Sequence, residues 1–396
     1  MQPMGIVEDT LGGPSVFKDL GKLDFDYVPP ELPGRDEAVR FLTQTYRSLL
    51  QGGQKEHAFL WGPVGSGKTV VAKRFAQDFR AALHRQGRAL EVSYVNCRTR
   101  KSSGLALLGI LRQFDPGYPE RGFSTGEMLQ DLRRHLERRT AHLLIILDEV
   151  DALIRAEGSD LVYDLTRFGS EAGPTWCGIS ILMISQENVL GNLDAAALST
   201  FKQTNQYAMT AYDVGGLEAI VHQRVQLAFH AGAVAPDLET LVADVVSAQG
   251  GNARLAIEVL QKAGRIADEA GKREVSAEMV RSAKADSYSY ITVAKLQNMG
   301  RHPLLVLLAL ARRLKKGDAY VTTGDTESAY KVACEEFGEE PRAHTQFWKY
   351  LKQLQDGGFI LSRLSGKGHA GTTQLLSIPD APAAAVEAKV TEWLGP

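Results

Sequence analysis

Cysteine is scarce in this chain, and neither sign of charge is in excess. The 3 cysteines, Cys97, Cys177 and Cys334, lie far apart, which argues against a disulfide framework and gives no zinc-ligand spacing. Lysine and arginine together number 45 against 47 acidic residues, for a net charge of -2. Because no overall field draws such a chain to DNA or anionic lipid, a nucleic-acid site has to be a local basic patch.

Long hydrophobic runs are missing as well. The longest, residues 304–311, is far shorter than the roughly 20 apolar residues that cross a bilayer. The opening MQPMGIVEDT has neither the basic stretch nor the apolar core of a signal peptide. We therefore expect a cytoplasmic protein without a membrane partner, and 396 residues predict two or three domains.

The first half of the chain alternates short apolar runs with helical patterns. Candidate strands are HAFLW (57–61), LEVSYVN (90–96), HLLIIL (142–147) and GISILMIS (178–185). Near-continuous apolar strands are typical of a parallel sheet that is covered on both faces. After a flexible tail at residues 1–15, residues 16–210 are predicted to form a doubly wound, three-layer α/β domain.

The second half lacks this alternation. Residues 211–290 show only helical periodicity and predict a small helical domain. In residues 291–396, three helical stretches precede two short strands, GFILSRL and TTQLLSI, which flank the glycine-rich GKGHAG. This order predicts a winged-helix, DNA-binding domain, with a last helix near the C-terminus.

A phosphate-binding loop follows the first strand. GPVGSGKT (62–69) fits the pattern G-x-x-x-x-G-K-[ST] between a strand and a helix. Its glycines let backbone N–H groups curl toward a phosphate, Lys68 would reach the β- and γ-phosphates, and the Thr69 hydroxyl would bind Mg²⁺. The alternative is an ordinary glycine-rich turn. The nucleotide contacts predicted here are Gly62, Pro63, Val64, Gly65, Ser66, Gly67, Lys68, Thr69 and Val70.

An acidic pair ends the third strand, in LLIILDEVD. Asp148 is the expected Mg²⁺ partner, through water, and Glu149 would orient and deprotonate the attacking water. A solvated strand end is the alternative for this pair. Asp151 is expected to cap the helix that follows.

Together these motifs resemble an AAA+ ATPase of the archaeal origin-recognition complex/cell-division-cycle type of replication initiator. Beside the two nucleotide motifs, the resemblance rests on YVPPELPGRDEAV (27–39), GGNARLAIEVLQKAGRIA (250–267) and residues 302–341 with the wing after them. It implies ATP/ADP and Mg²⁺ as cofactors, a lid at 211–290, and an N-terminal segment containing Val28 that closes over the adenine. Arg254 would sense the γ-phosphate, although by its residues alone it could equally pair with a surface acid.

Two positions depart from the family pattern. Gln186 stands where the family has an asparagine that holds the attacking water, and Asn188 is displaced by two residues. Ala196 stands at the arginine-finger position, and Lys202 is the nearest basic residue. Since such an arginine contributes about 10³–10⁵ in turnover, slow hydrolysis is expected.

A local basic patch lies in residues 342–373, where five basic residues face Asp356 alone. The helix at about 342–355 would read the major groove and the wing would lie along the minor groove. The apolar residues of this helix are expected to lie mostly in the core: Phe347, Trp348, Tyr350 and Leu351. The alternatives are a winged helix used for protein contacts and, for residues 98–101, a solvated loop. The predicted DNA contacts are Arg342, His344, Thr345, Gln346, Lys349, Lys352, Arg363, Lys367, His369 and Thr372, with Arg98, Arg100 and Lys101 from the ATPase domain.

The expectation is therefore a nucleoid-associated initiator that binds duplex origin DNA, helps recruit the replicative helicase and uses slow ATP hydrolysis as a switch. Other initiator subunits are further candidate partners. Ala196 and Gln186 favour an alternative, a nucleotide-locked DNA-binding regulator that does not hydrolyse ATP. A third option is a P-loop regulator of signalling or defence with a fused winged helix.

Overall fold

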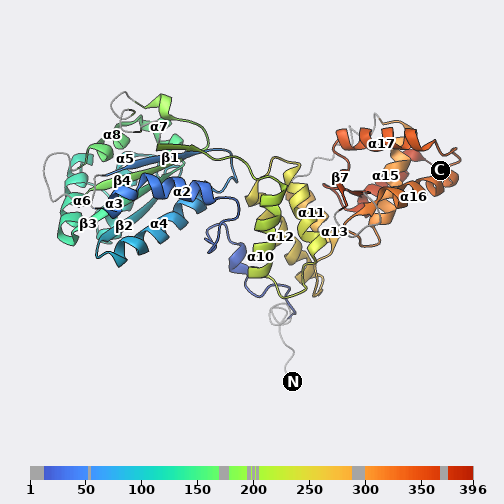
Figure 1. The fold of residues 1–396 in the computed structure, drawn as a ribbon, viewed down its shortest axis with the longest axis horizontal. Helices are drawn as coiled ribbons and strands as arrows, with labels where there is room; N and C mark the ends of the chain where they lie inside the picture. Colours follow the sequence, from blue (N-terminus) through green and yellow to red (C-terminus); the bar gives the residue numbers. More distant parts are fainter. Residues whose placement is uncertain are drawn as a thin grey trace, which may run out of the picture. The chain divides into compact units, whose positions relative to one another are not determined.

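The computed structural model describes residues 13–51, 55–168, 178–193, 198, 201, 205–287, 299–365 and 373–395. The chain divides into two compact units. One contains residues 28–212, and the other joins the N-terminal residues through Tyr27 to residues 213–396 (Figure 1). Within the described residues, no helix combines the length and the apolar character that crossing a membrane requires.

The unit of residues 28–212 is built on a parallel sheet with strand order β2-β3-β4-β1-β5. All eight residues of β3 are buried, which explains why this strand reads as an uninterrupted apolar run. The short edge strand β5 was not predicted, because three partly exposed residues carry no periodic signal. The strands are β1 (His57–Trp61), β2 (Ala89–Asn96), β3 (Ala141–Asp148), β4 (Ile179–Ser185) and β5 (Gln206–Ala208).

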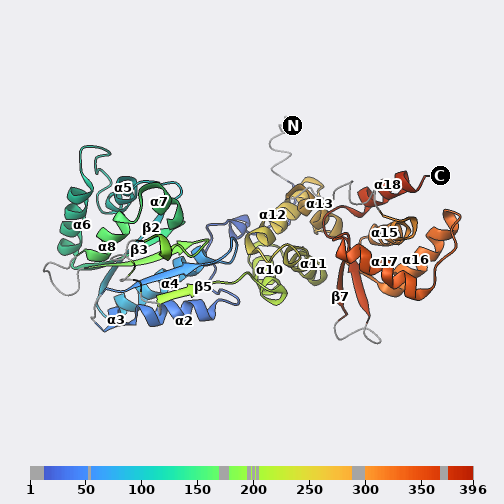
Figure 2. The same ribbon diagram turned by 90° about the horizontal axis from the view of Figure 1, so that it is seen from above.

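Helices cover both faces of this sheet, as predicted. Figure 2 shows α2 and α3 on one face and α5, α6, α7 and α8 on the other. The α4 helix packs Val71, Phe75 and Phe79 into the same apolar cluster as residues of α2 and α3. The helices are α2 (Asp36–Thr45), α3 (Arg47–Leu50), α4 (Lys68–Arg85), α5 (Ser103–Phe114), α6 (Thr125–Arg139), α7 (Val150–Glu157), α8 (Asp160–Arg167) and the 3₁₀ helix η2 (Leu190–Asn192).

The second unit begins with a helical domain that corresponds to the predicted lid. It consists of α10 (Val214–Ala228), α11 (Pro236–Ser247), α12 (Ala253–Glu269) and α13 (Ala277–Ser287). Residues 16–27, which sequence analysis grouped with the ATPase core, pack on these helices and include the 3₁₀ helix η1 (Leu20–Leu23). Phe17 holds them there, with its ring centroid 4.8 Å from that of Phe229. A Cβ at Gly264 would lie 2.2 Å from the Phe17 ring, so a larger residue there would force the ring to move.

The same unit ends in the predicted winged helix. The α15 helix forms its centre, with most of its residues buried. An antiparallel sheet of order β6-β8-β7 includes one strand, β6, that sequence analysis did not foresee, because it is two residues long. The elements are α15 (Arg301–Leu314), β6 (Val321–Thr322), α16 (Thr323–Glu336), α17 (His344–Asp356), β7 (Leu361–Leu364), β8 (Gln374–Ser377) and α18 (Ala383–Leu394).

Candidate nucleotide-binding site

The loop of residues 62–67 connects β1 to α4 and has the backbone of a phosphate-binding loop. Gly62, Gly65 and Gly67 all have positive φ, and Gly67 is the N-cap of α4. A Cβ at Gly62 would lie 2.1 Å from the carbonyl oxygen of Met209, so this position is restricted by space as well as by φ. The loop therefore directs the N-terminus of an 18-residue helix at whatever binds inside it.

Lys68 is the first residue of α4, directly after this loop, and is buried. Its ammonium donates to the carbonyl oxygens of Gly62 at 2.7 Å and Pro63 at 2.8 Å. Burial lowers the pKa of Lys68, and the nearby carboxylates, of which Asp148 is the strongest, act in the opposite direction. A phosphate bound in the loop would add a further charge that favours the ammonium form.

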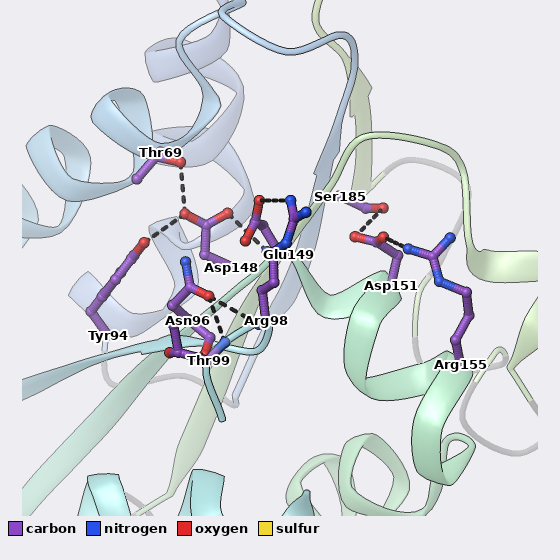
Figure 3. A network of polar contacts seen from close by, with 10 residues as sticks. All are labelled: Thr69, Tyr94, Asn96, Arg98, Thr99, Asp148, Glu149, Asp151, Arg155 and Ser185. Carbon is purple, nitrogen blue, oxygen red and sulfur yellow. Dashed lines mark hydrogen bonds and ion pairs between the residues drawn. The ribbon is translucent and has the colours of Figure 1, made fainter. Parts of the chain in front are cut away.

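Asp148 is the last residue of β3, and its carboxylate accepts three hydrogen bonds (Figure 3). Its Oδ2 accepts from the Thr69 hydroxyl at 2.6 Å and from the Tyr94 hydroxyl at 2.7 Å, and its Oδ1 accepts from the Glu149 amide at 2.9 Å. The structure thus brings together the two residues predicted to hold Mg²⁺. It adds Tyr94, which sequence analysis missed because a tyrosine within a strand has no motif to mark it.

The donor set fits Mg²⁺. Thr69 and Asp148 offer a hydroxyl and a carboxylate side by side, which are the hard oxygen ligands this ion takes. In the described part of the chain, no group of three or more His, Cys, Asp or Glu side chains could form an all-protein metal site. The remaining ligands would therefore be water and phosphate oxygens, as is usual for Mg²⁺.

Glu149 follows Asp148 in a left-handed conformation, with φ 53°. This conformation is strained for a residue other than glycine, and strained backbone conformations are often found at functional sites. Its carboxylate lies 3.7 Å from the Arg98 guanidinium. Glu149 and Gln186 line one pocket of about 530 Å³, so the structure brings together the two residues predicted to act on the attacking water.

Asp151 does not cap α7, so that prediction was wrong. Glu149 occupies the N-cap position, and Asp151 sits in the first turn of the helix. Its carboxylate pairs with Arg155 one turn later and accepts a hydrogen bond from the Ser185 hydroxyl at 3.3 Å (Figure 3). Asp151 therefore links α7 to the end of β4, beside the same pocket.

Arg254 lies in the first turn of α12, in the lid. The Asn252 side chain caps this helix and accepts from the Arg254 amide at 3.0 Å. The guanidinium lies over the ring of Phe25, 4.7 Å from its centroid. The role of Arg254 as a γ-phosphate sensor stays a prediction, and so does the contact of Val28 with the adenine.

Among the predicted DNA contacts of the ATPase domain, each residue has a different environment. Arg98 faces Glu149, as described above. Arg100 folds over the start of α5 and donates to the carbonyl oxygen of Leu105 at 3.1 Å. Lys101 is exposed and lines the pocket beside Glu149. Arg98 and Lys101 are thus both exposed to an external phosphate, whereas Arg100 is half-buried.

The α17 helix presents a polar face, as predicted for a recognition helix. Thr345, Gln346, Lys349 and Lys352 are exposed, whereas Phe347 and Leu351 are buried in the domain core. Trp348 was expected in the core but is 37% exposed; with Lys349 and Lys352 it lines a pocket of about 400 Å³. The Trp348 side chain points outward because Phe347 and Leu351 already fill the inward positions of the helix.

Two predicted DNA contacts near the start of α17 already have protein partners. Arg342 donates to the His302 ring at 2.9 Å. His344 lies 2.9 Å from a carboxylate oxygen of Glu327, and its other ring nitrogen accepts from the Trp348 indole. These bonds orient the edge of the helix, and DNA binding by Arg342 and His344 stays a prediction.

Arg363 on β7 faces the lid rather than open solvent. Its guanidinium donates to Glu218 at 3.1 Å and to Asp244 at 3.2 Å. Tyr320 donates its hydroxyl to the same Asp244 oxygen at 2.6 Å. A phosphate would have to displace two carboxylates to reach Arg363. The predicted residues Ala196, Lys202, Lys367, His369 and Thr372 lie outside the described residues.

Comparison with known proteins identifies the family. An AAA domain model matches residues 51–192, a Cdc6 AAA+ ATPase-type lid domain matches 218–285, and the CDC6 C-terminal winged helix domain matches 294–388. An ORC1-type DNA replication protein 2 of Sulfurisphaera tokodaii is 31% identical over 384 residues, covering 94% of this chain and 92% of the relative. The chain belongs to the family of ORC1-type DNA replication proteins. This confirms the resemblance that sequence analysis stated.

Solved structures of Cdc6 and ORC proteins share the architecture. Cdc6p from Pyrobaculum aerophilum matches with a TM-score of 0.83 and 27% identity, covering 96% of this chain and 99% of that one. Aeropyrum pernix ORC1, solved in complex with DNA, matches with a TM-score of 0.63 and 29% identity, covering 95% and 97%. Aeropyrum pernix ORC2 in ADPNP-ADP complexes matches with a TM-score of 0.63 and 25% identity, covering 96% and 98%.

Proposed function

We propose that this ORC1-type protein is an ATP-binding replication initiator that recognises duplex origin DNA. The observation that carries the proposal is a set of contacts at the end of β3: Asp148 accepts hydrogen bonds from the Thr69 hydroxyl and the Glu149 amide, and the phosphate loop beside them binds the Lys68 ammonium. This arrangement serves a nucleoside triphosphate, and it occurs in the same chain as a winged helix with an exposed polar face on α17.

The nucleotide site would work through positioning and charge. The N-terminus of α4 and Lys68 would bind the β- and γ-phosphates, and Thr69 with Asp148 would hold Mg²⁺, which neutralises charge on the phosphate oxygens. Glu149 would take the proton of the attacking water, and the Gln186 amide, on the same pocket, would orient that water. Hydrolysis would be slow because Ala196 cannot supply an arginine finger.

The DNA site would centre on α17. Thr345, Gln346 and Lys349 would reach base edges in the major groove, and Lys352 would contact phosphate. The Aeropyrum pernix relative, solved in complex with DNA, supports DNA binding as such. Lys101 would add a second, separate phosphate contact from the ATPase domain. Bound in this way, the initiator would help recruit the replicative helicase and, at some origins, further initiator subunits.

A second candidate function follows from the surroundings of Glu149. Arg98 faces the carboxylate that should activate water, and the finger position holds Ala196. A protein that binds ATP without turning it over, and so acts as a nucleotide-locked DNA-binding regulator, would have the same features.

Nucleotide binding and turnover of the full chain, with and without duplex DNA, separate the two functions. An ATPase switch should show slow turnover that Glu149→Gln abolishes while ATP binding remains, and Lys68→Ala should abolish both. Retained ATP with no turnover would support the regulator. Binding sites mapped along the host chromosome should coincide with replication starts; a distribution unrelated to those starts would refute the initiator function.

A further inference from the structure

Arg35 is a buried cation that binds the phosphate loop from outside. Its Nε donates to the carbonyl oxygen of Ser66 at 2.9 Å, its Nη2 to that of Thr210 at 2.9 Å and its Nη1 to that of Gly34 at 3.1 Å. The guanidinium carbon lies 3.6 Å from the centroid of the Tyr212 ring. One side chain thus joins the phosphate loop to two segments that are distant from it in sequence.

Tyr212 completes this arrangement. It is buried, and burial raises the pKa of its hydroxyl while the charge of Arg35 acts to lower it. A Cβ at Gly67 would lie 2.8 Å from the Tyr212 hydroxyl oxygen, so the ring end abuts the residue that caps α4. Met209, three residues earlier, lies against Gly62 in the same manner. The chain from 209 to 212 therefore runs along the outside of the phosphate loop.

The bond to Ser66 has a direct consequence for phosphate binding. In a trans peptide, the C=O and the N–H of one peptide unit point in opposite directions. The chain has no cis peptide among its described residues, so fixing the Ser66 carbonyl toward Arg35 turns the Gly67 N–H to the opposite side. In a phosphate-binding loop that side is the inside, where the amide can donate to a phosphate oxygen.

Arg35 and Tyr212 also stand beside the two crossings of the chain. The polypeptide enters the ATPase core at Val28 and leaves it after Tyr212. Arg35 lies seven residues after the first crossing, and Tyr212 is the last residue before the second. Both crossing segments are therefore attached to the phosphate loop by contacts made within the core.

We propose that Arg35 and Tyr212 act as one positioning pair, which presents the Gly67 amide to the nucleotide phosphates and transmits nucleotide occupancy to both segments that lead to the lid. The proposal deepens the nucleotide site and rests on the ATP binding proposed above. Neither residue touches the reacting atoms. Their effect passes through the backbone of the phosphate loop.

The test compares MgATP affinity of the full-length wild type with that of Arg35→Met, Arg35→Lys, Tyr212→Leu and Tyr212→Phe. Arg35→Met should bind MgATP at least about tenfold more weakly, because it loses charged donors to buried carbonyls and the stack on the ring. Arg35→Lys should restore part of the affinity, and Tyr212→Phe should bind within about twofold of wild type because it keeps the ring. Tyr212→Leu combined with Arg35→Met should add little to Arg35→Met alone, since the pair acts as a unit.

The matched control is Arg167→Met, which removes an exposed arginine whose guanidinium lies over the Tyr163 ring at 5.8 Å in the same domain. It should leave the affinity unchanged. A folded Arg35→Met variant that binds MgATP as wild type does would overturn this proposal and leave the ATP site intact. A wild type that binds no ATP would refute the proposed function as well.

Hydrogen exchange of the wild type supplies a readout that needs no variant to fold. In the wild type, MgATP should slow amide exchange in residues 28–35 and 209–212 as well as in the phosphate loop. In Arg35→Lys, saturating MgATP should protect the loop with weaker protection of the two crossing segments. Protection confined to the loop in the wild type would overturn the proposal, because a purely structural pair would not transmit occupancy.

Discussion

The Tyr94 hydroxyl donates a hydrogen bond of 2.7 Å to Asp148 Oδ2, the same oxygen that accepts from the Thr69 hydroxyl. Two donors on one carboxylate oxygen fix the orientation of the group and leave Oδ1 to the Glu149 amide. Tyr94 lies 39% exposed on β2, so the bond, rather than packing, is its main tie to the site. Outer partners of this kind tune the metal affinity of the ligand they orient.

Replacing Tyr94 by phenylalanine should therefore lower the affinity of the ATP-bound site for Mg²⁺ about tenfold, with little change in the free energy of unfolding. Mg²⁺ titrations of nucleotide affinity measure the effect. Tyr163→Phe is a matched control, because Tyr163 is 38% exposed in the same domain and lies on α8. Unchanged Mg²⁺ dependence in Tyr94→Phe would show that Asp148 is oriented without it.

Replacing Lys349 and Lys352 by alanine should weaken duplex binding and lower the slope of log affinity against log salt by about 1 for each DNA phosphate that the variant no longer neutralises. Both side chains are exposed on α17. The measurement is fluorescence anisotropy of labelled duplex at several salt concentrations. Lys389→Ala, on α18, is the control, since Lys389 pairs with Glu392. An equal reduction of affinity in the control and the double variant would contradict the assignment of α17 to DNA.

Arg363→Ala should act on stability rather than on DNA affinity. The variant loses the pairs with Glu218 and Asp244, which are partly exposed, so a cost of about 1 kcal/mol is expected. Denaturant unfolding of the full chain and duplex binding should be measured together. If Arg363→Ala loses as much DNA affinity as Lys349→Ala at unchanged stability, then Arg363 leaves the lid carboxylates to bind phosphate.

His57 should make the ATPase core sensitive to acid. Burial lowers its pKa to about 3, and the positive charge of Lys55 acts in the same direction. Below about pH 6.5, His57 is therefore protonated in the unfolded chain but stays neutral in the folded core. From pH 6.5 down to about 3, the free energy of unfolding should fall by about 1.4 kcal/mol per pH unit on account of this residue, and it should be unaffected above that range.

Hydrogen-exchange protection of β1 and β4, measured between pH 7 and pH 5, follows this loss in the core itself. His57 Nδ1 accepts from the Ile181 amide, so His57→Asn can keep the bond and remove the titration. That variant should lose less protection on acidification than wild type. His84→Asn, at an exposed position of α4, should behave as wild type. An unaltered acid response in His57→Asn would assign the sensitivity to other groups.

The parts of this molecule that were predictable from sequence are those in which local chemistry leaves few choices. Gly62 and Gly67 occupy positions that only glycine tolerates, and the acid pair at the end of β3 breaks an apolar run. Such features are visible in a linear sequence. The helical and strand periods likewise located the lid helices and the winged helix.

The sequence could not predict which residues the polar side chains would pair with. By sequence, Arg363 belongs to the basic patch predicted to bind DNA, and only the packing of β7 on the lid shows that it faces Glu218 and Asp244. Arg35 lies in a segment already linked to the nucleotide, but no spacing relates it to Ser66 or Tyr212. Trp348 was expected in the core because it is apolar, although its position on α17 directs it outward. Asp151 was expected to cap α7, but that helix begins one residue earlier, at Val150.

The Phe17 contact over Gly264 makes the lid a discontinuous domain. Val16 donates its amide to Asp268 at 2.7 Å, across a separation of 252 residues. During synthesis, the segment that completes the lid emerges first and has to wait until the whole ATPase core has been made. A fragment that begins at Val28, or a bulky tag placed close to Phe17, would therefore expose apolar surface on α12 and leave the lid incomplete, even though every residue of its four helices was present.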